Sequence, residues 1–233
     1  LVDSLPIVTV LLQKSKLTKQ TLILLYGLPG SGKSFFSRQA GELLNIPHIS
    51  SDRIRYELFE KPTYSKEEQA IVTNLMLMML EEYFKLGMSA IFDISINKLQ
   101  ERRNMRDFAR KHNVTPLLVW LQADPDTCFM RAKTRDRRKA DDKYSYEISA
   151  ELFDTVEKSM QQPQNEDVLV ISGKHLFESQ KHSLLRRLKE MQLLHEQQPE
   201  AKAVPKPELV NLVSRAQMAA GRVDTGRRNV FIN

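Results

Sequence analysis

The feature that most constrains this fold is one segment, Thr21–Ser34, with the sequence TLILLYGLPGSGKS. It begins with a continuous apolar run, which is typical of a buried strand. The run stops at Gly27, and the spacing G-x-x-x-x-G-K-S then ends in Gly32, Lys33 and Ser34. The next residues, FFSRQAGELL, have helical spacing. A buried strand, a glycine-rich turn and a helix in this order are the context of a phosphate-binding loop, so the sequence predicts a nucleoside-triphosphate site.

The glycines of this loop suit it to phosphate. They allow a positive φ and bare N–H groups that can point at phosphate oxygens, and the helix N-terminus adds its partial positive charge. Lys33 is expected to reach the β- and γ-phosphates, and the Ser34 hydroxyl is expected to ligate Mg²⁺. The loop residues expected to bind the nucleotide are Gly27, Pro29, Gly30, Ser31, Gly32, Lys33, Ser34 and Phe35.

Strand and helix patterns alternate along the rest of the chain. Apolar strand patterns recur at Pro47–Ser50, at 90–93, at Val114–Leu121 and at Val168–Gly173, with helical patterns between them. This alternation predicts an α/β fold with a parallel sheet and helices on both faces. One of these helices, Ser65–Leu86, carries three methionines that are expected to pack in the core.

Composition narrows the class of protein. A chain of 233 residues with 41% hydrophobic and 27% charged residues is ordinary for a globular protein, and its apolar runs are too short to span a bilayer. The single cysteine, Cys128, cannot form an internal disulfide, and no signal-peptide pattern opens the chain, so we expect a cytoplasmic protein. The net charge of +6 favours a polyanionic partner, though nucleotide-binding enzymes are often basic.

Two aspartates follow predicted strands. Because ligands of open α/β sheets sit at the carboxyl ends of the strands, we expect both near the phosphate loop. Asp93 could hold Mg²⁺ or its water, and Asp52 could accept the proton of an attacking hydroxyl. Arg55, one helical turn after Asp52, could hold an anionic group of the acceptor. The alternative is that Asp52, or its neighbour Ser51, and Asp93 merely cap the segments that follow them.

Two stretches are rich in arginine. In the predicted helix Asn97–Asn113 most of the charges are expected to form a solvated face. The stretch after the strand Val114–Leu121 suits a lid that closes over the triphosphate, although a salt-bridged helix end is the alternative. An arginine of this lid could stabilise charge during phosphoryl transfer.

Together these motifs resemble those of the polynucleotide-kinase-like branch of the P-loop kinases, with zeta-toxin-like and chloramphenicol-phosphotransferase-like relatives. The resemblance rests on GLPGSGKS, SDRIR, FDIS with Arg102 nine residues after Asp93, and MRAKTR, and it covers about 21–194. It implies that Asp52 is the general base and that Arg55 contacts the substrate phosphate. It also implies that the lid arginines are Arg131 and Arg135, with Arg135 clamping phosphate.

The resemblance implies a three-layer α/β/α kinase-type P-loop NTPase fold with a five-stranded parallel sheet. We divide the chain into an N-terminal helical extension (1–20), a P-loop kinase domain (21–194) with a lid at about 131–147, and a linker and C-terminal tail (195–233). The expected roles are catalysis by Asp52, Lys33 and Arg135, nucleotide binding by the loop and Arg131, acceptor binding by Arg55, Ser95 and Arg138, and metal binding by Ser34 and Asp93.

The expected function is an ATP- and Mg²⁺-dependent phosphotransferase whose acceptor is the 5′-hydroxyl of RNA or DNA. One alternative is a kinase acting on a sugar, an antibiotic or a nucleotide-sugar. The other is a nucleotide-switched binding module. No base-selecting motif separates adenine from guanine, and the sequence leaves the oligomeric state open.

Overall fold

The computed structural model describes residues 16–135, 143–144 and 148–194. Within them, helices and strands alternate along the chain. In order they are β1 (Thr21–Tyr26), α1 (Lys33–Leu44), β2 (His48–Ser50), α2 (Ser51–Leu58), α3 (Lys66–Lys85), β3 (Ala90–Asp93), α4 (Leu99–Lys111), β4 (Thr115–Gln122), α5 (Pro125–Lys133), α6 (Ala150–Ser159), β5 (Val168–Ser172) and α7 (Phe177–Glu190).

The strands form one parallel sheet in the order β2-β3-β1-β4-β5. The central strand, β1, is buried along its whole length, which explains why its sequence is apolar without alternation. In register, Leu24 lies between Phe92 of β3 and Leu118 of β4. The predicted α/β fold with a five-stranded parallel sheet is therefore confirmed.

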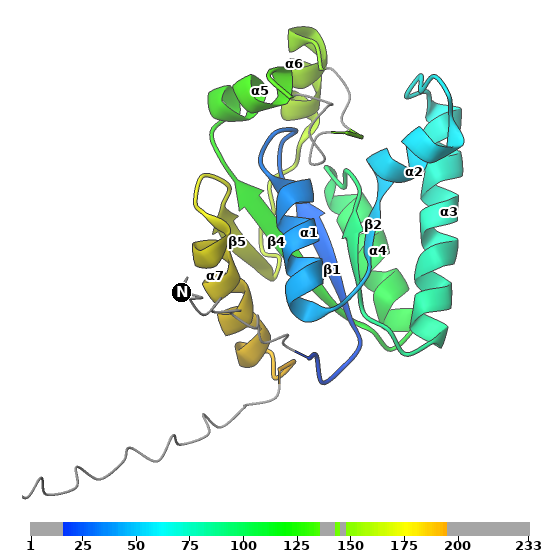
Figure 1. Cartoon of the computed structure of the whole chain (residues 1–233), viewed down its shortest axis with the longest axis vertical. Helices are drawn as coiled ribbons and strands as arrows, with labels where there is room; N and C mark the ends of the chain where they lie inside the picture. Colours follow the sequence, from blue (N-terminus) through cyan, green and yellow to red (C-terminus); the bar gives the residue numbers. More distant parts are fainter. Residues whose placement is uncertain (1–15, 136–142, 145–147, 195–233) are drawn as a thin grey trace, which may run out of the picture. The chain divides into compact units, whose positions relative to one another are not determined.

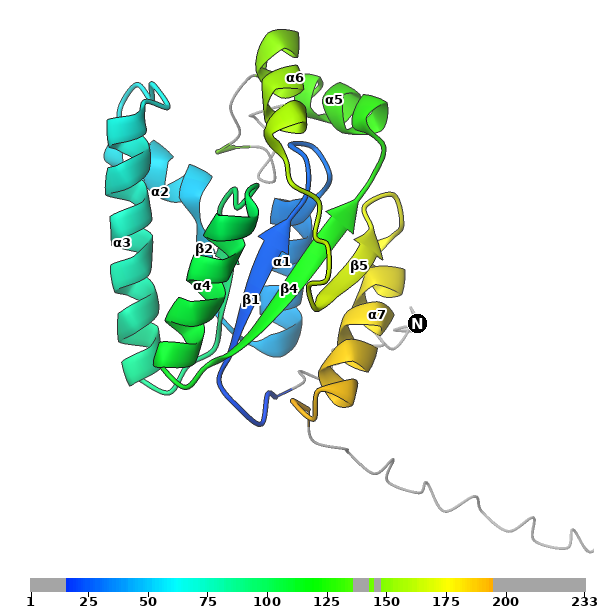
Figure 2. The ribbon, with the colours of Figure 1, turned by 180° about the vertical axis from the view of Figure 1, so that it is seen from behind.

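Helices cover both faces of the sheet. Ile23 and Leu25 of β1 point into a core shared with α1 and α7, which lie in front of the sheet in Figure 1. Leu22, Leu24 and Tyr26 point into a second core shared with α3 and α4, which lie in front when the molecule is seen from behind in Figure 2. This is the predicted three-layer arrangement.

The predicted helix boundaries rest on identifiable caps. Ser65 begins α3 by accepting a hydrogen bond from the Glu68 N–H, and Gly87 follows the helix with a φ of 74°. The prediction for the α3 methionines was only partly right. Met76 is buried and Met79 is partly buried, but Met78 is 63% exposed, because it lies on the face of α3 turned away from the sheet.

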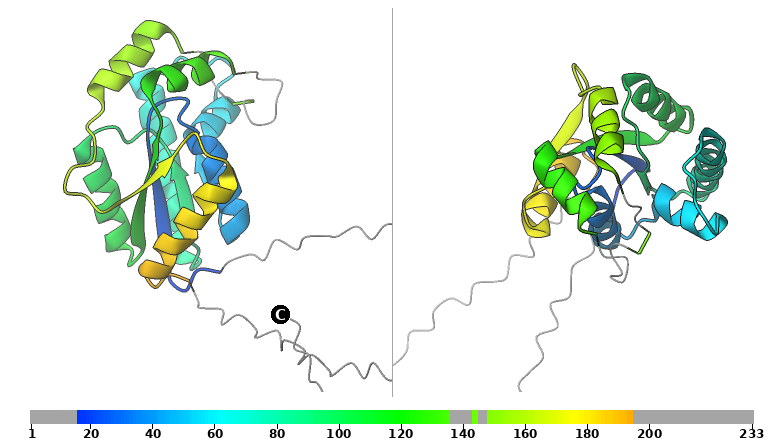
Figure 3. Two further views of the ribbon diagram at one scale, coloured as in Figure 1. Left: turned by 90° about the vertical axis from the view of Figure 1, so that its left-hand side faces the viewer. Right: turned by 90° about the horizontal axis from the view of Figure 1, so that it is seen from above.

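Two helices lie over the carboxyl ends of the strands. Residues of α5 and α6 enclose a small separate core made by Cys128, Ala132, Ile148 and Phe153. Figure 3 shows both helices from above, over the end of the sheet to which the strand arrows point. Cys128 is a buried free thiol.

Several predicted segments lie wholly or partly outside the described residues. These are residues 1–15 of the N-terminal extension, most of the lid after Arg135, and the linker and tail from 195 onward. At the described N-terminal end, Leu17 forms an antiparallel bridge with Leu194, and the Thr18 N–H donates to the Leu193 carbonyl at 2.9 Å. None of the helices in the described part of the chain has the length and apolar character needed to cross a bilayer.

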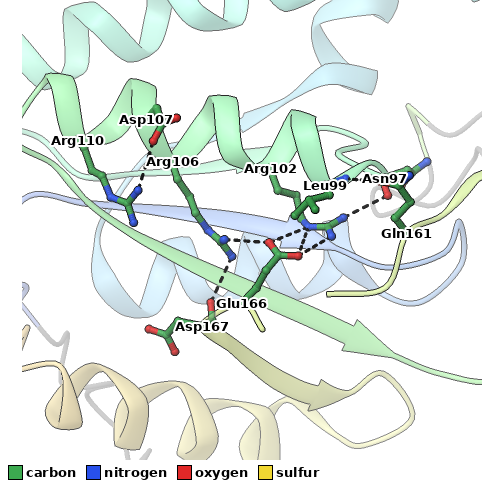
Figure 4. Close-up of polar contacts among 9 residues, drawn as sticks. All are labelled: Asn97, Leu99, Arg102, Arg106, Asp107, Arg110, Gln161, Glu166 and Asp167. Atoms are coloured by element: carbon green, nitrogen blue, oxygen red, sulfur yellow. Dashed lines mark hydrogen bonds and ion pairs between the residues drawn. The ribbon is translucent and has the colours of Figure 1, made fainter. Parts of the chain in front are cut away.

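The prediction that most of the α4 charges form a solvated face holds for Arg103, Arg110 and Lys111, which are exposed, but not for Arg102 and Arg106. Arg102 is fully buried and donates to Glu166 from both Nε and Nη2, the latter at 2.6 Å, while Arg106 reaches the same carboxylate at 2.9 Å (Figure 4). The Arg102 guanidinium also lies 4.9 Å from the centre of the Tyr26 ring and donates to the Asn97 carbonyl. This cluster joins α4 to the segment before β5 and to the end of β1.

Replacing Glu166 with Gln is expected to destabilise the fold strongly. The Glu166 side chain is only 4% exposed, so its loss leaves two arginines with little access to water and no compensating charge. Breaking a buried pair in this way costs about 3–5 kcal/mol. Urea unfolding measures the change in free energy, and the exposed pair of Asp107 with Arg110 supplies the control. Asp107→Asn should cost less than about 0.5 kcal/mol, and an equally small effect at Glu166 would contradict the proposed role of the cluster.

Candidate functional site

The phosphate loop connects β1 to α1 in the predicted geometry. Gly27, Gly30 and Gly32 all have positive φ, at 147°, 84° and 99°, and Gly32 is the N-cap of α1 without a side-chain cap. The first backbone N–H groups of α1 therefore have no capping oxygen from the N-cap residue. Such a helix start can hold an anion such as phosphate.

Two glycines in this region are required by close packing. A β-carbon on Gly30 would overlap the Cys128 carbonyl of α5, and one on Gly173, just after β5, would overlap the Ser31 carbonyl. Ser31 itself is fully buried, and its Oγ has no hydrogen-bond partner among the described residues. The loop is thus held between α5 and the end of β5, with no room for side chains at these contacts.

Gly30→Ala is expected to weaken nucleotide binding by at least about tenfold. Its β-carbon would meet backbone atoms, which cannot rotate away, and its φ is in the region that disfavours side chains. The dissociation constant for ATP checks this. Gly87→Ala is a matched control, because Gly87 also has positive φ but has open space around it. Gly87→Ala should lose stability while keeping its affinity for ATP. Equal affinities for ATP in the two variants would contradict the prediction.

Lys33 folds back over the loop. Its Nζ donates to the carbonyls of Gly27 at 2.7 Å and Leu28 at 3.0 Å. An ammonium group has three donors, so one remains for a phosphate oxygen. Burial lowers the pKa of Lys33, and the nearby Asp93 and Asp52 carboxylates oppose that shift. Lys33 therefore both braces the loop and brings positive charge to it.

Asp93 lies beside Ser34 at the end of β3. Its carboxylate hydrogen-bonds the Ser34 hydroxyl and lies 3.2 Å from Nε2 of His48. Burial alone would raise the pKa of Asp93, but the contacts with His48, Lys33 and Ser34 outweigh it, so the pKa lies below its usual value and the group is a carboxylate. A hydroxyl and a carboxylate are oxygen ligands of the kind that Mg²⁺ takes alongside phosphates and water, so this pair fits Mg²⁺.

Asp52 faces the same site from the first turn of α2. The N-cap of α2 is Ser50, which accepts from the Arg53 N–H, so the alternative of Ser51 or Asp52 as the cap is wrong. Partial burial, and then the neighbouring Asp93 charge, raise the pKa of Asp52 to about 6. A carboxylate tuned toward neutral pH is suited to accept a proton.

Arg55 is held by several partners. It is 3% exposed, its Nη1 lies 4.0 Å from the Asp52 carboxylate, and its Nη2 donates to Gln69 at 2.5 Å. Its Nε lies 3.5 Å from Glu68, and its guanidinium lies 4.5 Å from the centre of the Tyr64 ring. These contacts hold the buried Arg55 guanidinium next to the Asp52 carboxylate.

The other predicted site residues are spread around one cavity of about 1020 Å³, which lies at the carboxyl end of the sheet and continues along α1. Arg131 lines it and donates to the Gly173 carbonyl at 2.7 Å. The Arg135 charge acts on both Lys33 and Asp52. Arg138 lies outside the described residues. The predicted residues that line the cavity are Pro29, Gly30, Gly32, Lys33, Ser34, Phe35, Asp52, Asp93, Ser95, Arg131 and Arg135.

Sequence reasoning missed three contributors to the site. His48 contacts Asp93, Gly173 packs on the phosphate loop, and Tyr144 lines the cavity. The position of His48 at the start of the strand that precedes Asp52 was a usable signal, since β2 and β3 pair in parallel. The other two depend on chain segments that meet only in the folded protein.

Comparisons with known proteins agree with this architecture. The model of a family described as an AAA domain matches residues 22–163. No curated protein sequence matches the chain. A sugar kinase from Janibacter sp. HTCC2649 has a similar structure, with a TM-score of 0.53 at 13% identity over 75% of this chain and 95% of that one.

Two further solved structures are similar. The APS kinase CysC of Mycobacterium tuberculosis, in complex with AMPPNP and APS, has a TM-score of 0.56 at 15% identity over 73% of this chain and 98% of that one. A chain of the Pnkp1/Rnl/Hen1 RNA repair complex has a TM-score of 0.52 at 17% identity, over 60% of this chain and 44% of that one. At these identities the likeness establishes the fold, which is that of the P-loop kinases.

Proposed function

The chain belongs to the AAA domain family, whose model covers more than half of it, and we propose a function from this membership and from the residues of the site. The protein is proposed to be an ATP- and Mg²⁺-dependent phosphotransferase that acts on a hydroxyl group. The observation that carries the proposal is the meeting of a phosphate loop with two carboxylates, Asp52 and Asp93, in one cavity. A loop that only binds nucleotide has no need of Asp52, whose pKa is raised toward neutrality.

The residues divide into those that hold the donor and one that activates the acceptor. The loop N–H groups and Lys33 hold the triphosphate. Arg131 and Arg135 add positive charge where negative charge develops on the phosphoryl group during transfer. Asp52 accepts the proton of the acceptor hydroxyl as the hydroxyl oxygen attacks the γ-phosphorus in line, and the bond from that phosphorus to the β–γ bridging oxygen breaks, releasing ADP. Arg55 is buried beside Asp52 and does not line the cavity, so we assign it the positioning of Asp52 in place of the predicted contact with the acceptor.

Ser34 and Asp93 would hold Mg²⁺ in this proposal. When bound, the ion neutralises charge on the phosphates. The hydrogen bond between Ser34 and Asp93 keeps the two oxygen ligands together, and His48 orients the carboxylate from the other side. In the described part of the chain no three His, Cys, Asp or Glu side chains cluster as a metal site, which agrees with an ion that takes most of its ligands from phosphate and water.

The proposed acceptor is the 5′-hydroxyl of RNA or DNA. The support is the Asp-x-x-Arg pair, Asp52 and Arg55, the net charge of +6, and the likeness to a structure from an RNA repair complex. A small-molecule acceptor is the second candidate, because the sugar kinase and the APS kinase share the fold equally well. Arg138 and Ser95 are proposed to contact the acceptor in either case.

The proposed base predicts the pH dependence of the reaction. Because the pKa of Asp52 is raised to about 6, the carboxylate is protonated below that pH and cannot accept a proton. We expect kcat/KM to rise about tenfold per pH unit up to about pH 6 and then to level off. Steady-state kinetics between pH 4.5 and 8 measure the profile. A residual activity of Asp52→Asn that keeps the same acidic limb would refute the assignment.

Salt separates the two classes of acceptor. Binding of a nucleic acid releases counterions, so KM for an oligonucleotide should rise steeply with salt, whereas KM for a neutral sugar should change little. The test offers 5′-hydroxyl oligonucleotides beside pooled sugars and nucleosides and repeats the measurement at several salt concentrations. Transfer only to small molecules, with KM insensitive to salt, would assign the acceptor to the small-molecule class and would still support a phosphotransferase.

A further inference from the structure

The cavity has an aromatic and cationic rim on the side of α2. Arg53 and Tyr144 both line the cavity. Tyr56 follows Asp52 by four residues, so the two side chains lie on the same face of α2, about 6 Å apart along the helix axis. We call the set of Arg53, Tyr56, Lys143 and Tyr144 the aromatic rim.

The members of the rim contact one another through their rings. The ring centres of Tyr56 and Tyr144 lie 5.4 Å apart with an angle of 72° between the planes, which is an edge-to-face pair. The Arg53 guanidinium lies 5.9 Å from the centre of the Tyr144 ring, and the Lys143 ammonium lies 5.4 Å from it. Two cations are therefore gathered at one ring beside the proposed base.

Core packing does not explain these contacts. Tyr56 is 52% exposed and the Arg53 side chain is 59% exposed. The contrast is with the pair of Tyr26 and Arg102, whose similar cation–ring contact is buried in the core. Exposed aromatic rings interleaved with cations are the means by which proteins bind single-stranded nucleic acid, because bases stack on the rings and phosphates meet the cations.

The rim lies on the acceptor side of the site. The strand order places β2, and with it α2, at one edge of the sheet. The strand β5 lies at the other edge, where Arg131 donates to the carbonyl of Gly173. Figure 3 shows α2 well apart from β5 when the molecule is seen from above. A ring bound at the rim is therefore close to Asp52 and far from the segment that follows β5.

We propose that the aromatic rim stacks the 5′-terminal base of a single-stranded nucleic-acid acceptor, an inference that rests on the phosphotransferase function proposed above. A nucleoside carries its 5′-hydroxyl and its base on one sugar, so a hydroxyl at Asp52 brings the base to within one helical turn, where Tyr56 and Tyr144 lie. A sugar or other small alcohol has no aromatic base, so it cannot make this π-stacking contact.

The test compares two single-stranded oligonucleotides with the full chain. Both carry a free 5′-hydroxyl, but in one the 5′-terminal nucleotide is abasic. Affinity is measured by fluorescence anisotropy and kcat/KM by phosphate transfer, with RNA and DNA versions of each. The intact terminus should bind roughly 5- to 100-fold more tightly than the abasic one, the range expected for one stacked base.

Variants locate the effect. Tyr144→Ala should lose this preference, because its affinity for the intact oligonucleotide falls while its affinity for the abasic one stays the same. Tyr144→Phe should keep the preference. Leu58→Ala is the matched control, since Leu58 is a 48% exposed residue of α2 that does not line the cavity. If the role of Tyr144 is purely structural, Tyr144→Ala should lower the affinity for both oligonucleotides equally.

The outcomes separate the two proposals. Transfer to both oligonucleotides with equal efficiency would overturn the stacking site and keep the polynucleotide kinase. Preferential binding of the intact terminus without any transfer would keep the stacking site and overturn the proposed function. If the oligonucleotides are neither bound nor phosphorylated, both proposals are overturned. Transfer restricted to sugars would overturn the stacking site.

Discussion

Asp52→Asn is expected to lower the rate of phosphate transfer by about a hundred- to ten-thousand-fold, the contribution of a positioned general base. The change removes the proton acceptor but leaves the phosphate loop, Lys33 and Asp93 in place, so the dissociation constant for ATP should stay the same. Stability should not fall. Because burial and Asp93 raise the pKa of Asp52, its charged form is disfavoured in the folded protein at neutral pH, and a neutral side chain removes that penalty.

Three measurements on the same preparation check this prediction. They are single-turnover transfer, ATP binding and the thermal midpoint. Glu60→Gln, an exposed residue just after α2, is the matched control and should behave as the unchanged protein. Full transfer activity in Asp52→Asn with ATP bound would exclude Asp52 as the base.

Lys33→Ala is expected to damage both nucleotide binding and transfer. The side chain donates to two loop carbonyls, so its loss loosens the loop before any phosphate arrives. It also removes the cation that faces the β- and γ-phosphates, and the loss of one such charged donor costs about a hundred- to thousand-fold in rate. We therefore expect weaker ATP binding together with a slower chemical step.

The two variants differ in a way that identifies each role. ATP binding should survive Asp52→Asn and be weakened by Lys33→Ala, as measured by titration with a fluorescent ATP analogue. Lys66→Ala, at the exposed start of α3, controls for the loss of a lysine. Normal ATP affinity in Lys33→Ala would mean that the backbone alone holds the triphosphate.

Much of this architecture could be predicted from local sequence. The apolar run before Gly27 makes β1, and the positive φ values of the loop require its glycines. Asp93 ends β3 and Asp52 comes just after β2, the neighbouring parallel strand, so their meeting in one cavity follows from the topology. These features depend on residues close in sequence or on a rule that applies to every parallel sheet.

Other features depend on contacts between distant segments. Arg102 looks like one more charge on a basic helix, and its burial becomes intelligible only with Glu166, which is 64 residues away. The packing of Gly173 on Ser31 and the ring contact of Tyr56 with Tyr144 likewise join separate parts of the chain. Hydrophobic periodicity carries no information on such pairs, so it cannot distinguish the buried arginines of α4 from the exposed ones.

The most direct test of the central claim is to follow radiolabelled γ-phosphate from ATP in the presence of Mg²⁺ and a 5′-hydroxyl RNA oligonucleotide. We predict label at the 5′ end of the oligonucleotide, dependent on Mg²⁺ and lost in Asp52→Asn. Label confined to a sugar or nucleoside in a mixed pool would keep the kinase and replace the acceptor. Bound ATP with no transfer to any hydroxyl in the pool would contradict the assignment of this protein as a phosphotransferase.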